Sequence, residues 1–209
     1  MDQELALELY ELCKAEKPDM KRAEELIQSG RIDLNASAVP HACISFLTTA
    51  IDHFNYSIAE LLLENGADPN AEAEEYGSAL WTATRFHAYY LKEEPKADPI
   101  RHLRMARLLL EKGADPNGSK GTAEAVLDYV VFRMFNDLGL DKVDYDYAVK
   151  SVILMAAYGA ATEYCKPEIL KPLDKERIDQ YSFHWGRHED GHHCFGVVEN
   201  AEGEIVAYI

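Results

Sequence analysis

The residue types most capable of chemistry gather near the C-terminus. Four of the eight histidines, His184, His188, His192 and His193, fall within ten residues, and Cys194 follows directly. Zinc requires three or four nitrogen, sulfur or oxygen donors that converge at about 2.0–2.3 Å. A hairpin could bring three such donors together; the candidate ligands are His184, His188, His192 and Cys194. Their spacing matches no established zinc signature, and neighbouring strand residues point in opposite directions. We expect a polar hairpin loop and keep a metal site as the alternative.

Two other patterns bear on catalysis. Residues 118–122 (GSKGT) have the composition of a phosphate-binding loop, but they lack the Gly-x-x-x-x-Gly-Lys-Ser/Thr order and follow a helix, not a strand. The paired carboxylates of residues 74–75 and 93–94 fall in predicted exposed loops, where such pairs are usually solvated. No nucleophile, base and acid can be assembled, and no cysteine has a reason to be activated. The sequence therefore predicts a protein that is not an enzyme and uses no cofactor.

Composition and net charge limit the fold class and the kinds of partner that the sequence allows. The chain has 209 residues, 47% of them apolar, which is enough for a sizeable core and predicts one domain or a short repeat array. Lys and Arg total 21 against 37 Asp and Glu, a net charge of −16. Nucleic acids and anionic membranes need a positive field, so neither is an expected partner. A basic protein partner is compatible with this charge.

The cysteines and the N-terminus indicate the compartment. Four cysteines are widely spaced, and no two form a Cys-x-x-Cys pair; they are Cys13, Cys43, Cys165 and Cys194. Such spacing in a chain of this length is typical of reduced thiols. The acidic start, MDQE, is unlike a signal peptide, and no apolar run approaches the roughly 20 residues of a membrane span. We therefore expect a soluble, cytoplasmic protein.

The chain also repeats itself. Residues 61–70 read LLLENGADPN and residues 108–117 read LLLEKGADPN, an offset of 47. Weaker copies occur at residues 154–162 (LMAAYGAAT) and 25–35 (ELIQSGRIDLN). In each copy the apolar residues fit the buried stripe of a helix. The glycine fits the helix C-terminus, because glycine adopts positive φ without a Cβ clash.

A second, shorter helical pattern precedes three of these copies. Leu47, Leu80 and Leu127 mark it, at spacings of 33 and 47 residues. Ser45 and Ser78 stand where a hydroxyl can cap the first turn of the helix. The predicted unit is therefore a loop, a short helix, a turn, a longer helix and a glycine stop. Its base length is about 33–35 residues, which two copies exceed.

This unit resembles the ankyrin repeat, which opens with Thr-Pro-Leu-His-x-Ala and ends in Leu-Leu-x-x-Gly-Ala-Asp-x-Asn. The second element is close to the family pattern twice, in the two Gly-Ala-Asp-Pro-Asn copies, whereas the first is degenerate. The resemblance covers roughly residues 4–162 and implies a mainly α fold, an ankyrin-type α-solenoid of about four irregular helix-turn-helix repeats. The expected units are 1–35, 36–70, 71–117 and 118–162, followed by a C-terminal segment, 163–209.

Two insertions depart from the repeat pattern, at residues 88–98 and 134–144. Both fall between the two helices of a unit, so we expect them on the same side of the array. In one interpretation they are surface extensions that the fold tolerates. In the other they form a binding rim that presents aromatic residues such as Tyr89, Tyr90 and Phe135.

The last 47 residues change character. Residues 166–179 contain two prolines and fit a helical fragment at most. The segments typical of strands are 181–186, 194–199 and 204–209, and residues 200–203 (NAEG) are typical of a hairpin turn. We predict a small antiparallel hairpin or sheet of two or three strands that covers the apolar end of the array. In the alternative it has a binding role of its own. Whether residues 163–180 add a further degenerate repeat stays open.

Binding is the function that a repeat array itself suggests, because its short helices and turn tips line one concave groove. The resemblance implies recognition through the turn tips and the exposed residues of each first helix. Carried onto this sequence, the helix positions are Thr49, Asp52, His53, Thr82, Arg85, Phe86, Tyr129, Phe132 and Arg133. The turn tips are Glu72, Glu74, Glu75, Tyr76, Ser119, Lys120 and Thr122. Trp81 falls at a position that is usually half-buried.

Acidic turn tips beside aromatic residues suit a protein partner that presents Lys or Arg. The sequence therefore predicts a non-catalytic protein-interaction module that binds through its concave face and inserted loops. A more specific hypothesis is an acidic inhibitor or immunity-type protein that neutralises a basic enzyme such as a nuclease. In the alternatives, the acidic residues only keep the surface soluble, or the His-rich C-terminal segment acts as a metal-binding module. The oligomeric state stays open.

Overall fold

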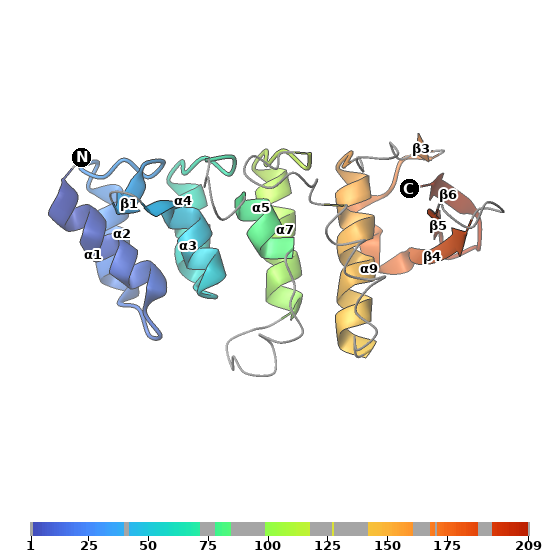
Figure 1. Cartoon of the computed structure of the whole chain (residues 1–209), viewed down its shortest axis with the longest axis horizontal. Helices are drawn as coiled ribbons and strands as arrows, with labels where there is room; N and C mark the ends of the chain where they lie inside the picture. Colours follow the sequence, from blue (N-terminus) through green and yellow to red (C-terminus); the bar gives the residue numbers. More distant parts are fainter. Residues whose placement is uncertain are drawn as a thin grey trace.

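The structure is a computed structural model that describes residues 2–39, 42–71, 78–84, 99–117, 127, 142–160, 168–169, 171–187 and 194–208. Helices predominate in this part of the chain, and a small antiparallel sheet lies at its C-terminal end (Figure 1). The helices stand side by side in a row that follows the sequence from the N-terminus, in blue, to the sheet, in red. The prediction of mainly helical structure with a small C-terminal sheet is confirmed.

The first helix pair is formed by α1 (Gln3–Lys14) and α2 (Met20–Gln28). Each begins after an aspartate whose carboxylate accepts a backbone N–H, which is a favoured N-cap: Asp2 accepts from Leu5, and Asp19 accepts from Arg22. Buried residues recur at helical spacing, so each helix has one apolar stripe. They are Ala6, Leu9 and Cys13 on α1, and Ala23, Leu26 and Ile27 on α2.

The second helix pair is preceded by a hairpin that the sequence did not predict. Strands β1 (Ser37–Val39) and β2 (Ala42–Ser45) pair antiparallel where we expected a loop. Strands of three and four residues are too short for a period of two to stand out. The helices themselves, α3 (Phe46–Asp52) and α4 (Tyr56–Glu64), confirm the predicted pair. The predicted cap is also present, since Ser45 Oγ accepts the N–H of Thr48 at 3.1 Å.

The row continues with α5 (Ala79–Thr84), α7 (Pro99–Glu111) and α9 (Lys142–Ala157). Ser78 caps α5 as predicted, because its Oγ accepts the N–H of Trp81 at 3.1 Å. Helices of the same rank touch in order: α1 contacts α3 and α3 contacts α5, while α2 contacts α4, α4 contacts α7 and α7 contacts α9. Of the two predicted insertions, only residues 142–144 belong to the described part, as the start of α9.

A positive-φ glycine follows each of the helices α2, α4, α7 and α9, where the sequence predicted a glycine stop. Gly66 has φ +88° and Gly113 has φ +93°, and Gly30 and Gly159 also lie in this region. The residue after Gly66 and the residue after Gly113 each close a helix end. Ala67 N–H donates to the Leu62 carbonyl at 3.0 Å, and Ala114 N–H donates to the Leu109 carbonyl at 2.9 Å. A Cβ at Gly66 or Gly113 would meet no atom within 4 Å. The backbone conformation, not space, therefore requires glycine here.

Asparagine side chains join each of these turns to the next one. The asparagine lies two residues after the aspartate of the Asp-x-Asn motif, and it bonds the backbone of the following turn. The bonds are Asp68 N–H to Asn35 Oδ1 (2.7 Å), Asp115 N–H to Asn70 Oδ1 (2.7 Å), Asn70 Nδ2 to the Gly113 carbonyl (2.9 Å) and Asn117 Nδ2 to the Gly159 carbonyl (3.2 Å). An asparagine side chain therefore bonds the following turn at three successive junctions, through Oδ1 at the first, through both Oδ1 and Nδ2 at the second, and through Nδ2 at the third.

The C-terminal segment forms a sheet with the strand order β3-β6-β5-β4. Its elements are β3 (Glu168–Ile169), the 3-10 helix η1 (Lys175–Gln180), β4 (Ser182–Arg187), β5 (Cys194–Glu199) and β6 (Ile205–Tyr208). All neighbouring strands are antiparallel. The three predicted strands and the turn at residues 200–203 are confirmed, with Gly203 at φ +77°. Strand β3, which has two residues, was not predicted.

This segment packs against the last helix of the row. Leu173, Ile178 and Phe183 belong to the same buried cluster as the helix residues. Polar contacts accompany the packing: Arg107 on α7 lies 2.6 Å from Glu176, Lys150 on α9 lies 3.1 Å from Asp179, and Lys175 Nζ lies 3.8 Å from the centre of the Tyr158 ring. The C-terminal segment is thus attached to the end of the row by apolar contacts and by charged contacts from η1.

Among the residues that the structure describes, no helix is both long enough and apolar enough to cross a membrane.

Candidate protein-binding surface

The first-helix positions that we expected to face a partner lie partly inside the protein. Thr49 on α3 is 1% exposed and Thr82 on α5 is 5% exposed. The hydroxyl of Thr49 donates to the carbonyl of Ser45 at 2.9 Å, so it is satisfied within its own helix. Because α3 contacts both α1 and α5, neighbouring helices cover it, and residues 46–51 are all buried. The expected exposure of Thr49 and Thr82 is therefore wrong.

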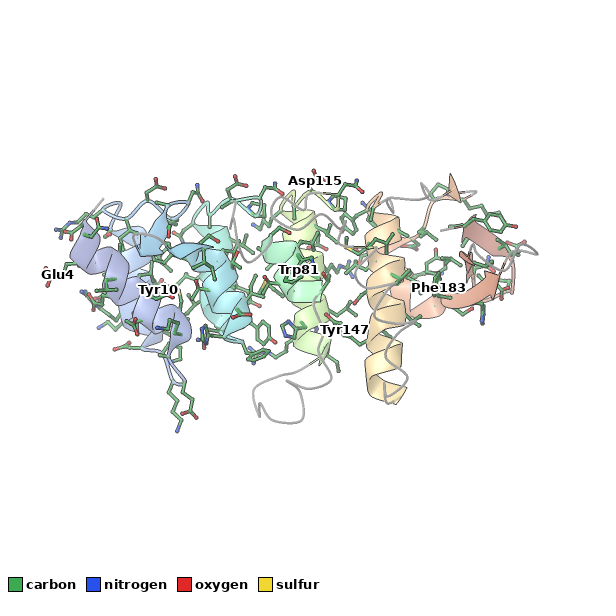
Figure 2. All side chains as sticks on the ribbon, in the orientation of Figure 1. Glu4, Tyr10, Trp81, Asp115, Tyr147 and Phe183 are labelled. Carbon is green, nitrogen blue, oxygen red and sulfur yellow. The ribbon has the colours of Figure 1, made fainter. Side chains whose placement is uncertain are left out.

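Two further predicted positions are accessible at the end of α3. Asp52 is half-buried, and His53, which caps the helix, is exposed. On α5, Trp81 is half-buried and packs against the core, as expected for its position (Figure 2). The remaining predicted positions lie outside the described residues; they are Glu72, Glu74, Glu75, Tyr76, Arg85, Phe86, Ser119, Lys120, Thr122, Tyr129, Phe132 and Arg133.

The described turns carry a row of aspartates that we call the acidic edge, defined as Asp33, Asp68 and Asp115. All three are exposed, and Figure 2 shows Asp115 on the side of the row where the turns lie. The Oδ1 atom of each accepts the backbone N–H of the asparagine two residues later, at 3.0, 2.8 and 2.9 Å respectively. This bond holds each carboxylate in a fixed orientation at the tip of its turn.

The acidic edge has no cationic partner among the described residues. Within the described part of the chain, neither an ion pair with Lys or Arg nor a bond to the second carboxylate oxygen is formed by these three residues. Carboxylates of this kind attract Lys and Arg side chains and steer their approach. The sequence contained a signal for this surface, because Asp-x-Asn occurs at 33–35, 68–70 and 115–117. The repeat pattern instead predicts the acidic turn tips at residues 72–75, which lie outside the described residues.

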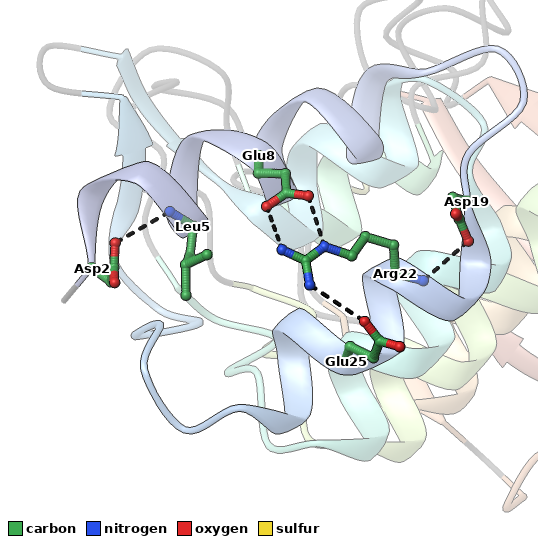
Figure 3. Close-up of polar contacts among 6 residues, drawn as sticks. All are labelled: Asp2, Leu5, Glu8, Asp19, Arg22 and Glu25. Carbon is green, nitrogen blue, oxygen red and sulfur yellow. Dashed lines mark hydrogen bonds and ion pairs between the residues drawn. The ribbon is translucent and has the colours of Figure 1, made fainter.

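The N-terminal helix pair shows the opposite electrostatic arrangement (Figure 3). Arg22 Nε and Nη2 donate to the two carboxylate oxygens of Glu8 at 2.7 and 2.8 Å, and Nη1 donates to Glu25 at 3.3 Å. These hydrogen bonds raise the pKa of Arg22 and lower the pKa of Glu8. Here both carboxylates are paired with one arginine that links α1 to α2, and the cluster as a whole keeps a single net negative charge. Its main role is therefore to join the helix pair, in contrast to the aspartates of the acidic edge, which the described part of the chain leaves unpaired.

The candidate metal ligands are not brought together by the described residues. The exposed His184 has Nε2 3.2 Å from Ser182 Oγ and 3.6 Å from Glu199 Oε2. The register places Cys194 opposite Arg187, three positions from His184 on β4, so positions 184 and 194 belong to opposite faces of the sheet. His188 and His192 lie outside the described residues. Elsewhere in the described part, no group of three His, Cys, Asp or Glu residues could hold a metal ion.

No protein-family model matches the chain, and no curated protein matches it.

Proposed function

We propose that the chain is a non-catalytic protein-interaction module of the ankyrin type, an α-solenoid of about four units that spans residues 1–162. Four positive-φ glycines at the ends of equivalent helices support this proposal. The asparagine bridges from each turn to the next support it further, because they repeat at three junctions. A repeat array gains its stability through such contacts between nearest neighbours.

Both ends of the described chain have the features that an array end requires. At the N-terminal end, the Glu8–Arg22–Glu25 cluster makes a polar surface on the first helix pair. At the other end, residues 163–209 act as a cap: Ile178 and Phe183 are buried in the common core, and Glu176 reaches Arg107 of α7. An array without such ends would expose the apolar faces of its terminal units.

The binding surface in this proposal is centred on the acidic edge, which follows the C-terminal ends of α4 and α7. The accessible end of α3 and the start of α7, where the inserted segment rejoins the row, lie at the opposite ends of these helices and would form a second contact region (Figure 1). The partner is a basic protein. Exposed ion pairs contribute only about 0.2–1 kcal/mol each, so the three aspartates would steer the partner and fix its orientation. The apolar anchors of the complex would come from the aromatic residues predicted at 76, 86, 129 and 132.

The orientation of the three edge carboxylates is the observation that carries this proposal. Each is held by a backbone N–H, exposed, and left without a cation by the described residues. In its most specific form, the protein is an acidic cytoplasmic inhibitor or immunity-type protein that occupies the cationic surface of a basic enzyme. Nucleic acids and anionic membranes are not expected partners, because the net charge of −16 repels them.

A comparison of two charge variants tests the proposal. The edge variant carries Asp33→Asn, Asp68→Asn and Asp115→Asn, which remove three charges but keep the Oδ1 acceptor of each turn. The control variant carries Glu4→Gln, Glu60→Gln and Glu64→Gln, which remove three exposed charges from α1 and α4. Each protein is cross-linked in its native cells and the captured proteins are quantified by mass spectrometry. Basic proteins should be captured by the wild type and the control variant and lost by the edge variant. Equal capture by all three would contradict the proposal.

A further inference from the structure

The turn between α3 and α4 holds an aromatic residue in an unfavourable backbone conformation. Phe54 has φ +59°, and it is the only non-glycine residue with positive φ in the described part of the chain. The turn closes in the same way as the glycine stops, because Asn55 N–H donates to the carbonyl of Ala50 at 2.8 Å. Glycine adopts this conformation freely, whereas a side chain with a Cβ is strained in it. The phenylalanine ring must therefore make contacts that compensate for the strain.

The ring of Phe54 is one wall of an aromatic socket. We define the socket as Phe54 and Tyr56, whose ring centres lie 6.4 Å apart. His102 of α7 is inserted against both: its ring centre lies 5.3 Å from each, at interplanar angles of 72° to Phe54 and 87° to Tyr56. Edge-to-face pairs of this kind are favourable, and His102 is only 6% exposed. The guanidinium of Arg101 lies 4.9 Å from the centre of the Tyr56 ring, which adds a cation–π contact.

The socket holds one particular part of α7. Arg101 and His102 belong to the first turn of that helix, which begins at Pro99. The predicted insertion, residues 88–98, ends directly before it. The turn that carries the socket is itself fixed to the first helix pair, because Asn55 Nδ2 donates to the carbonyls of Cys13 and Ala15 at 2.6 and 3.1 Å. The point at which the insertion rejoins the row is therefore tied, through one turn, to α1.

We infer that the Phe54–Tyr56 socket is an anchor that fixes the base of the inserted segment, and that Phe54 occupies this positive-φ position, where glycine would be unstrained, for this purpose. Phe54 and Tyr56 are positioning residues: they set where the insertion rejoins the row, at the first turn of α7, and do not themselves contact a partner. The use of the insertion in binding rests on the proposed function, but the anchoring does not. A loop with a fixed base loses less conformational freedom when it binds, which favours affinity.

Hydrogen exchange measured by mass spectrometry on the full chain tests the anchor without any partner. The test variant is Phe54→Gly, which relieves the backbone but removes the ring. The amides of residues 103–106, which bond the first turn of α7, should then exchange about tenfold faster, while those of α2 stay within about twofold of the wild type. Phe54→Tyr, which keeps a ring, and Ile100→Ala, which shortens an exposed side chain on the same turn, should both leave the exchange at 103–106 unchanged.

Two results would overturn the anchor. Unchanged exchange at residues 103–106 in Phe54→Gly would show that the ring holds nothing, and uniformly faster exchange in every helix would show a general loss of stability. Neither result bears on the acidic edge, whose variants leave the socket intact. The outcome is therefore independent of the capture experiment that tests the proposed function.

Discussion

The side-chain amide of Asn70 is bonded on both sides to the turn that contains Asp115, one unit further along the chain. Its Oδ1 accepts the N–H of Asp115 at 2.7 Å, and its Nδ2 donates to the carbonyl of Gly113 at 2.9 Å. One side chain thereby satisfies a backbone N–H and a backbone carbonyl of the glycine turn that follows α7, where helical hydrogen bonds have ended. The same turn presents a carboxylate of the acidic edge. The bridge between units and the proposed binding surface are therefore built from the same residues.

Removing this amide should weaken the array at one junction. Asn70→Ala leaves the Asp115 N–H and the Gly113 carbonyl without their partner, so we expect the free energy of unfolding to fall by about 1–2 kcal/mol. Asn65→Ala is the control, because the one bond that Asn65 Nδ2 makes within the described part of the chain is to the Leu61 carbonyl of its own helix. That change should cost less than about 0.5 kcal/mol. Urea unfolding of the two variants measures the difference, and equal effects would show that the bridge adds nothing.

The glycine stops should depend on backbone conformation alone. A methyl group at Gly113 meets no atom within 4 Å, but φ is +93°. Gly113→Ala should therefore lower the free energy of unfolding by about 1–2 kcal/mol. Gly113→Asn should cost less, because asparagine tolerates positive φ better than other residues with a side chain. Thermal unfolding compares the two. If alanine and asparagine are equally tolerated at no cost, the turn does not require this conformation in solution.

The attachment of the C-terminal segment should depend more on apolar burial than on its ion pairs. Ile178 is 9% exposed in the common core, whereas the Glu176 side chain that pairs with Arg107 is 79% exposed. Ile178→Ala should cost about 2–4 kcal/mol, and Glu176→Gln less than about 1 kcal/mol. Both values come from urea unfolding. A larger effect of Glu176→Gln would mean that charge, not packing, fastens the cap.

Stability should decline in alkaline solution. Burial raises the pKa of the Cys13 thiol to about 12, from an ordinary value of 9.0. The unfolded chain therefore loses this proton first, so the contribution of Cys13 is complete below pH 9 and is lost between pH 9 and 12. Burial also raises the pKa of Tyr147, whose hydroxyl donates to the Ala83 carbonyl at 2.8 Å, and this acts in the same direction at higher pH.

For Cys13 the expected loss is about 1 kcal/mol at pH 10. Urea unfolding of the wild type and Cys13→Ala at pH 8 and pH 10 isolates it. The wild type should lose more stability than the variant over this interval. If both proteins lose the same amount of stability between pH 8 and pH 10, the Cys13 thiol is not buried in solution as it is in the structure.

The sequence predicted the elements that have local signals. Glycine and serine fixed the ends of helices such as α3, α4 and α7, because a cap hydroxyl and a positive-φ glycine act within one turn. The strands at 182–187 and 194–199 also followed from local alternation. In contrast, β1 and β2, which pair with each other, have only three and four residues and show no period. Strand β3 has two residues and is held by pairing with β6, a distant segment of the chain.

The candidate site was harder to predict for the same reason. Burial of Thr49 and Thr82 is imposed by helices from neighbouring units, which no window around either threonine reveals. The partners of Asn70 and Phe54 lie 43 to 48 residues away in the sequence. The acidic edge, by comparison, was present as a repeated Asp-x-Asn motif. The orientation of these carboxylates could not be predicted from the sequence, because it is set by hydrogen bonds to the backbone of each turn.

The dissociation constant of the captured basic partner, measured against salt concentration, tests the central claim most directly. Wild type, the edge variant and the control variant are compared by calorimetry between low and high salt. Neutralising Asp33, Asp68 and Asp115 should weaken binding by about tenfold at low salt and flatten its salt dependence, while the control variant should stay close to the wild type. If the edge variant binds with the wild-type affinity and salt dependence, the acidic edge is not the surface that meets the partner.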